Sequence, residues 1–185
     1  MKTIFKTILL LSLSLTYFSF YSCSSLKVIS DVNKSTNFKQ YKTYRWATTE
    51  QPLDKNYPQF DNTLNRQRIR RAIDISMENQ EYTLANGDTV DLEVDFHIQF
   101  KQIKVPYHSL DYYEGDFYNG IQTNEIYQYE EGILIIHLID LKQKQLVWQG
   151  VLSRVLDVSK LEEAETEIQK NISKLFKKFN SQISE

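Results

Sequence analysis

The sequence predicts an α+β domain in which a mainly antiparallel sheet of about five or six strands is packed by two amphipathic helices in two layers. Three observations carry this prediction: a hairpin of two apolar runs over residues 127–156, a polar–apolar alternation over 90–104, and helical apolar stripes over 61–80 and 160–180. The 185 residues, 41% hydrophobic and 25% charged, fit a single domain over 26–185 behind a targeting segment.

The hairpin is predicted to form the centre of the sheet. Residues 133–141 are apolar at nearly every position, which indicates a strand covered on both faces or nearly so. The polar residues 142–145 are expected to form the turn. In the second run we expect Leu146 on the same face as Trp148, and Val147 on the opposite face.

Further strands are predicted over 26–32, 43–47 and 82–84. The strand over 90–104 alternates, so one of its faces should be buried and the other solvated. Asp95 and His97 lie on the solvated face, where nitrogen and oxygen ligands could bind a metal. Alternate residues of one strand lie about 6.5 to 7 Å apart, so one strand does not enclose an ion. We therefore expect an ordinary polar face, with these two residues as weak metal candidates.

The first helix, over 61–80, has Asp61 or Asn62 as its N-cap. It carries four closely spaced basic side chains, Arg66, Arg68, Arg70 and Arg71. They suit either an anion site or a solvated helix face paired with Asp74 and Glu78, and we favour the solvated face.

The second helix, over 160–180, has the most regular apolar stripe of the chain, and we expect it to pack on the sheet as core. Ser159 and Glu162 before it fit a capping box.

Residues 105–129 are predicted to be an irregular, aromatic-rich connection. Tyrosine with Asp and Asn on a loop is common binding-surface chemistry, because the rings offer flat amphipathic area at low entropic cost. The alternative is a long connection whose rings pack back on the sheet. The candidate binding residues are Tyr107, Tyr112, Tyr113, Phe117 and Tyr118.

The first 22 residues have the parts of a secretory signal that is cleaved. Lys2 and Lys6 form a basic start, and the apolar run of about 14 residues is too short for a membrane span of about 20. The lone Cys23 follows, in a stretch that resembles a bacterial lipobox, so we expect Cys23 to carry the acyl chains, including palmitate, of a lipoprotein. Residues 23–25 are then the lipidated cysteine and a short tether. Ser24 in the next position suggests the outer membrane, on its periplasmic face.

The mature chain resembles the DUF4136 family of bacterial envelope lipoproteins, whose function is unknown. The likeness rests on YKTYRW at 41–46, RIRRAI at 68–73, DLEVDFH at 91–97, and the hairpin pair 132–140 and 146–150. It spans residues 26–180 and implies an α+β fold and an envelope location, without a reaction. This chain departs from the family pattern at His137, where the family usually has Asp.

We expect a non-enzymatic, lipid-anchored binding or structural module of the periplasm. Its expected partners are the membrane, through the acyl chains, and an envelope protein or a glycan. Nucleic acid is not expected at a net charge of −2 without a polybasic run, and no cofactor is expected. The alternative is a metal-dependent or hydrolytic enzyme that uses His97, Asp95 and either His108 or His137. Against it, the sequence has no G-x-S-x-G, HExxH or P-loop, and His137, within an apolar run, is expected to be a hydrogen-bonded core histidine.

Overall fold

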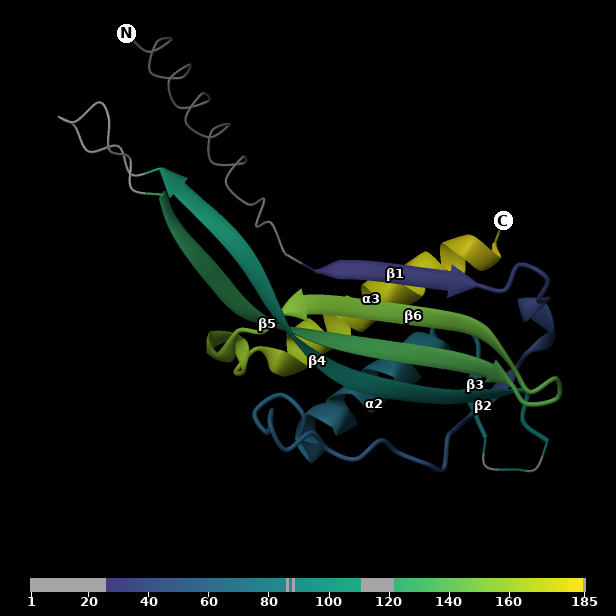
Figure 1. Ribbon diagram of the computed structural model, residues 1–185. Helices are drawn as coiled ribbons and strands as arrows, with labels where there is room; N and C mark the ends of the chain where they lie inside the picture. The colour runs from purple at the N-terminus through teal and green to yellow at the C-terminus, as the bar shows by residue number, and fades with distance from the viewer. Residues whose placement is uncertain (1–25, 86, 88, 111–121, 185) are drawn as a thin grey trace, which may run out of the picture.

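The computed structural model describes residues 26–85, 87, 89–110 and 122–184. In this part of the chain six strands form one sheet and two helices lie behind it, which confirms the predicted α+β class (Figure 1). The helices and strands are β1 (Lys27–Val32), β2 (Thr43–Trp46), α2 (Thr63–Glu78), β3 (Thr83–Leu84), β4 (Leu92–Leu110), β5 (Gln122–Asp140), β6 (Gln145–Val155) and α3 (Ala164–Ile183).

The sheet has the strand order β1-β6-β5-β4-β2-β3. The four strands β1, β6, β5 and β4 pair antiparallel, whereas β2 runs parallel to both β3 and β4. The sheet is therefore mixed at one edge. Its parallel pair β2–β3 is made possible by α2, which crosses between the two strands and returns the chain to the same end of the sheet.

The core lies between the helices and one face of the sheet. Ile136 and Leu138 of β5 point to this side and are fully buried, together with Trp148 of β6. The Trp148 ring lies 4.8 Å from that of Phe179 and 5.1 Å from that of Phe176, both on α3. Burial of these aromatic and aliphatic side chains holds the two layers together.

The opposite face of the sheet, called the open face from here on, has no helix over it in the described part of the chain (Figure 1). Strand β5 is central, as predicted, but helices cover only one of its faces. Three isoleucines of β5 point to the open face and are half-buried: Ile133, Ile135 and Ile139. The prediction of cover on both faces was wrong, because neighbouring strands shield these side chains without a second layer.

A β-bulge in β6 changes the predicted faces of the hairpin. Leu138 pairs with Trp148, whereas Ile139 pairs with Leu146, so Val147 is the extra residue and is buried. Leu146 consequently shares the open face with Ile139 and is exposed, rather than lying on the side of Trp148 as predicted. A bulge changes the alternation of side chains, and the sequence alone does not show it.

The helix starts were predicted in one case and missed in the other. Asn62 caps α2, since its side chain accepts a hydrogen bond from Asn65 N at 2.9 Å. The predicted capping box of α3 is wrong, because the helix begins at Ala164 without a side-chain cap. Asp157 accepts from both the backbone N–H and the hydroxyl of Ser159, which holds that residue in a separate 3₁₀ turn.

Candidate functional site

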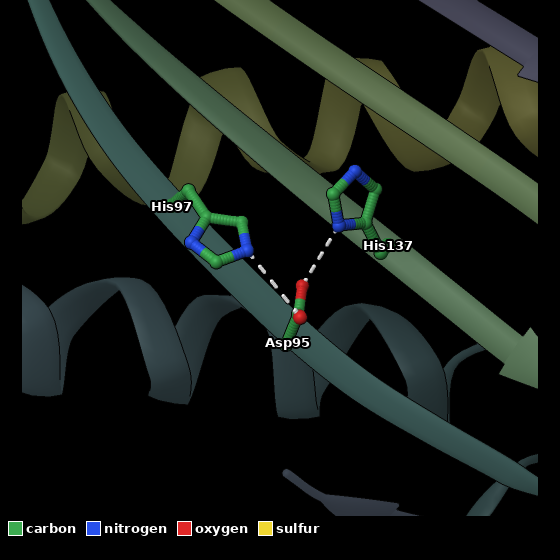
Figure 2. Close-up of side chains that lie close together, drawn as sticks. All are labelled: Asp95, His97 and His137. Carbon is green, nitrogen blue, oxygen red and sulfur yellow. Dashed lines mark hydrogen bonds and ion pairs between the residues drawn. The ribbon is translucent and has the colours of Figure 1, made fainter. Parts of the chain in front are cut away.

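Three side chains with metal-ligating atoms meet on the open face, in the middle of β4 and β5. Asp95 and His97 are alternate residues of β4, and His137 of β5 pairs with Asp95 in the strand register. The Asp95 carboxylate lies between the two imidazoles, 2.9 Å from His137 Nδ1 and 3.4 Å from His97 Nε2 (Figure 2). One donor atom from each residue lies within 4.8 Å of the other two. We call these three residues the histidine–aspartate cluster.

Gln149 of β6 continues the row across the sheet. It pairs with His137 in the register, and its side-chain oxygen Oε1 lies 3.1 Å from His137 Nε2. The two ring nitrogens of His137 are thus directed at two oxygen acceptors, a carboxylate on one side and an amide on the other. Hydrogen bonds on both sides determine the orientation of the ring.

The cluster is accessible without being fully solvated. The exposed fractions of the side chains are 22% for Asp95, 40% for His97 and 20% for His137. The nearby Arg45 forms its ion pair with Glu93, at 2.9 Å, in the next row of the sheet. The charge of Arg45 is therefore balanced locally, and the Asp95 carboxylate interacts with the two histidines.

The sequence located two members of the cluster and named the third, His137, only as an alternative to His108 in the enzyme hypothesis. Asp95 and His97 lie on the solvated side of β4, as predicted. His137 is hydrogen-bonded, as predicted, but it lies half-buried on the open face and not in the core. Both faces of β5 are apolar in sequence, so the pattern does not show which face His137 occupies. Gln149 was missed because only the strand register places it beside His137.

A second feature is a two-stranded ribbon that extends from the sheet (Figure 1). Strands β4 and β5 pair over 19 residues each, from Leu92–Asp140 to Leu110–Gln122. The pairing of β6 with β5 ends at Glu131–Val155, so the ribbon continues beyond the six-stranded sheet. The prediction of an irregular connection over 105–129 was therefore wrong for its two ends. Mutual backbone pairing satisfies these polar groups where no helix supports them.

The candidate binding residues of the sequence are only in part described. Tyr107 lies in the ribbon, opposite Glu125. Tyr112, Tyr113, Phe117 and Tyr118 lie outside the described residues, as do the predicted signal segment 1–22, Cys23 and the predicted tether. Neither described helix has the length and apolar composition of a membrane-spanning helix.

The four arginines of α2 form ion pairs with carboxylates of the same chain. This favours a helix face held by ion pairs over an anion site. Arg66 makes a two-pronged contact with the buried Asp61, at 2.6 and 2.8 Å. This ion pair also counters the effect of burial, so that the pKa of Asp61 lies below its ordinary value. The partners differ from the predicted Asp74 and Glu78. The remaining pairs are Arg68–Glu165, Arg70–Glu50 and Arg71–Glu165.

An apolar cavity of about 180 Å³ lies between the sheet and the N-terminal halves of both helices. Phe60, Ile69, Phe100 and Ile168 contribute to its wall. Asn65 and Asn171 of the two helices are among the polar residues that line it. The charged residues Arg154, Asp157, Lys160 and Glu167 also line it.

These features define a two-layer α+β domain with a projecting β-ribbon and a two-histidine, one-carboxylate cluster on its open face. The chain belongs to the DUF4136 family, a domain of unknown function, whose family model matches residues 28–179. No curated protein matches the chain.

Among solved structures, the chain is similar to a PDZ domain protein from Parabacteroides distasonis, with 14% identity and a TM-score of 0.47. That match covers 86% of this chain but 38% of the other, so the chain spans little more than a third of that protein. The PelC dodecamer from Paraburkholderia phytofirmans matches in two crystal forms, with 10% identity and TM-scores of 0.42 and 0.41. Both matches cover 81% of this chain and 96% of PelC. Similarities this distant assign no function to the chain.

Proposed function

We propose that this chain is a lipid-anchored protein of the bacterial cell envelope that binds another protein through the β4–β5 ribbon. The projecting ribbon is the observation that carries the proposal. A ribbon that only connected two strands would need a turn of a few residues, whereas this one extends well past the last residue of β6.

The side chains of the ribbon support a protein as the partner. Val105, which is 44% exposed, shares one face of the ribbon with the exposed Tyr129, whereas Ile126, which is 60% exposed, lies on the other face. Exposed apolar side chains that gather on one element often mark a protein-interaction site, whereas single ones are common on any surface. An aliphatic and aromatic surface suits a polypeptide better than a glycan, which needs polar groups beside each ring.

The backbone of the ribbon offers a second means of recognition. Next to the sheet, the outer edge of β4 is covered at Ile98, where the Gln51 side chain both donates to the carbonyl and accepts from the N–H at 2.9 Å. In the described part of the chain, β5 is the strand that pairs with β4 beyond this point. An outer strand edge can bind an extended segment of another chain by strand addition.

The anchor comes from the sequence, in which Cys23 follows an apolar signal and precedes β1 by only a few residues. We place the protein at the outer membrane, on the periplasmic side, within a short distance of the lipid surface. A ribbon that projects from a tethered domain would extend its reach toward a partner.

In-cell photo-crosslinking tests whether a protein binds the ribbon. A photoreactive residue at position 126 should give a discrete protein adduct, and one at the exposed Lys177 of α3 should not. Ile126→Lys should abolish co-purification of that partner, whereas Leu64→Lys, at an exposed apolar position of α2, should not. A glycan adduct, or equal adducts from both positions, would reject the ribbon as a protein-binding surface.

A hydrolytic activity on the strand face of Asp95 and His97 is the second candidate. It is favoured by the approach of His137 to both residues, because two imidazoles beside a carboxylate can move protons or bind a catalytic metal. The test compares ester and phosphoester hydrolysis by the purified chain and by its His97→Ala variant. Equal rates in the two proteins would exclude this function.

A further inference from the structure

The histidine–aspartate cluster has the chemistry of a metal site, which the binding function proposed above does not use. Two imidazoles and one carboxylate are typical ligands of divalent transition-metal ions. We propose that Asp95, His97 and His137 together bind such an ion on the open face, with Zn²⁺ as the best chemical match. The proposal rests on the geometry of these side chains and is independent of the role of the ribbon.

The distances in the cluster are close to those of a bound ion. Zinc lies about 2.0 to 2.2 Å from nitrogen and oxygen ligands, which in a tetrahedron places neighbouring donor atoms about 3.3 to 3.5 Å apart. His97 Nε2 lies 3.4 Å from Asp95 Oδ2, whereas His137 Nδ1 lies 2.9 Å, a hydrogen-bond distance, from the other oxygen, Oδ1. With all three donors within 4.8 Å, small side-chain rotations suffice to close them around one ion.

The hydrogen bonds of His137 favour a cation at this point. Its Nε2 faces the Gln149 Oε1 acceptor and its Nδ1 faces the Asp95 carboxylate, which also only accepts. A neutral ring has one N–H and therefore satisfies one of the two oxygens. With the proton on Nε2, the lone pair of Nδ1 faces the Asp95 carboxylate, and this contact is favourable only when a cation, either a second ring proton or a metal ion bound by both groups, is present.

Gln149 would then act as the outer partner of the site. Metal-bound histidines usually donate their second N–H to a carbonyl or carboxylate, which determines the tautomer and the ring orientation. Gln149 occupies that place for His137, at 3.1 Å. Its position is set by the pairing of β6 with β5, so the partner is supplied by a neighbouring strand rather than by a loop.

The site is built on the central strands of the sheet. Asp95 and His97 come from β4, which pairs with β5 along its whole length, and β6 holds the other side of β5. Ligands on paired strands are positioned more accurately than ligands on loops, so less order has to be created when the ion binds.

The remaining coordination positions of the ion would face away from the sheet. All three ligands extend from one face (Figure 2), and both described helices lie on the opposite side of the sheet (Figure 1). Three protein ligands and open positions are typical of sites that bind water or a further ligand, whereas structural zinc sites have four protein ligands. A mixed nitrogen and oxygen set also disfavours Ca²⁺ and Mg²⁺, which prefer oxygen ligands alone.

Metal titration of the full-length chain in detergent tests the proposal. Isothermal titration calorimetry with ZnCl₂ should give one ion per chain, and CoCl₂ should produce the visible bands of a protein-bound Co²⁺ ion. His97→Gln and His137→Ala should each weaken Zn²⁺ binding by more than the loss for Gln149→Leu, which should be about 10–100-fold.

His108 supplies the matched control, because it is the one histidine of the sequence outside the cluster and lies eleven positions beyond His97. His108→Ala should bind Zn²⁺ like the unchanged protein. His97→Gln alters a partly exposed side chain and should preserve the fold, which circular dichroism checks. Absence of saturable Zn²⁺ and Co²⁺ binding, unchanged binding in His97→Gln, or equally tight binding of Ca²⁺ would overturn the proposal.

Discussion

Asp140 at the end of β5 is a buried carboxylate that joins three segments of the chain. It accepts a hydrogen bond from the Tyr41 hydroxyl at 2.6 Å and from the backbone N–H groups of Lys142 and Gln143 at 2.8 Å each. A buried charge is tolerated only when such partners replace water. Asp140 therefore stabilises the turn between β5 and β6. Through Tyr41 it also attaches the segment before β2 to this turn.

Loss of the Tyr41 hydroxyl should destabilise the fold. Burial and the contact with Asp140 raise the pKa of Tyr41 to about 12, so the hydroxyl remains a donor at neutral pH. A hydrogen bond to a charged group contributes about 1.5 to 3 kcal/mol, and we expect Tyr41→Phe to lower the free energy of unfolding by this amount. Urea denaturation measures it. Tyr57→Phe, which removes a longer, partly exposed bond to Glu130, should have a smaller effect.

The effect of Tyr41→Phe should depend on pH. Burial alone would raise the pKa of Asp140, but the bonds from Tyr41 and the turn outweigh it and hold the pKa below its ordinary value of 3.8. The stabilisation is therefore complete above pH 3.8 and is lost as the pH falls through the lower pKa of the folded state. Unfolding at about pH 7 and about pH 3 should show a smaller difference between the two proteins at the lower pH. An equal difference at both values would contradict this account.

At the scale of the elements, the contact of β6 with α3 depends on a glycine. A β-carbon on Gly150 would lie 2.6 Å from Leu175 Cδ2 and 2.6 Å from the Trp148 ring. Both neighbours are buried in the core, so neither can move aside without disturbing the packing. Gly150 thus allows α3 to approach the sheet closely.

Gly150→Ala should destabilise the protein by about 1 to 3 kcal/mol, which is typical of overpacking in a core. Gly132→Ala is the matched control on β5. Its added carbon would meet mainly the Leu156 side chain, which is half-buried beside the apolar cavity and can move. Thermal unfolding of both variants tests the comparison, and equal melting temperatures would show that α3 can shift to make room.

The predicted elements succeeded where the pattern was local. The stripe over 160–180 corresponds to α3, and Asn62 caps α2 as its position suggested. The alternation over 90–104 assigned the faces of β4 correctly. Errors arose at the bulge of Val147 and in the ribbon, where the outcome depends on pairing with another strand. The capping box of α3 was a local signal that failed, because Asp157 holds Ser159 in a 3₁₀ turn before the helix.

At the scale of the whole molecule, the proposed anchor determines where the domain acts. Each buried methylene of an acyl chain contributes about 0.8 kcal/mol, so two or three chains hold a protein firmly to a bilayer. Cys23→Ala should therefore move the protein from the membrane to the soluble fraction and abolish fatty-acid labelling.

Ser25→Ala is the control for the anchor, and it should leave both the membrane fraction and the labelling unchanged. If the Cys23→Ala variant still fractionated with the membrane, the proposed lipoprotein anchor would be rejected. The folded domain itself should be unaffected by either change, because both residues precede β1.

The sequence by itself determined the fold class, the two helices, the centrality of β5 and the polar side of β4 that carries Asp95 and His97. Each of these follows from the periodicity of neighbouring residues, which is a local property. Only the tertiary structure decided that β2 runs parallel to β4, that β4 and β5 continue into a ribbon, and that His137 and Gln149 lie beside Asp95. These depend on strand register and on which face the helices cover. Both are determined by packing between distant segments, so the pattern along the chain does not contain them.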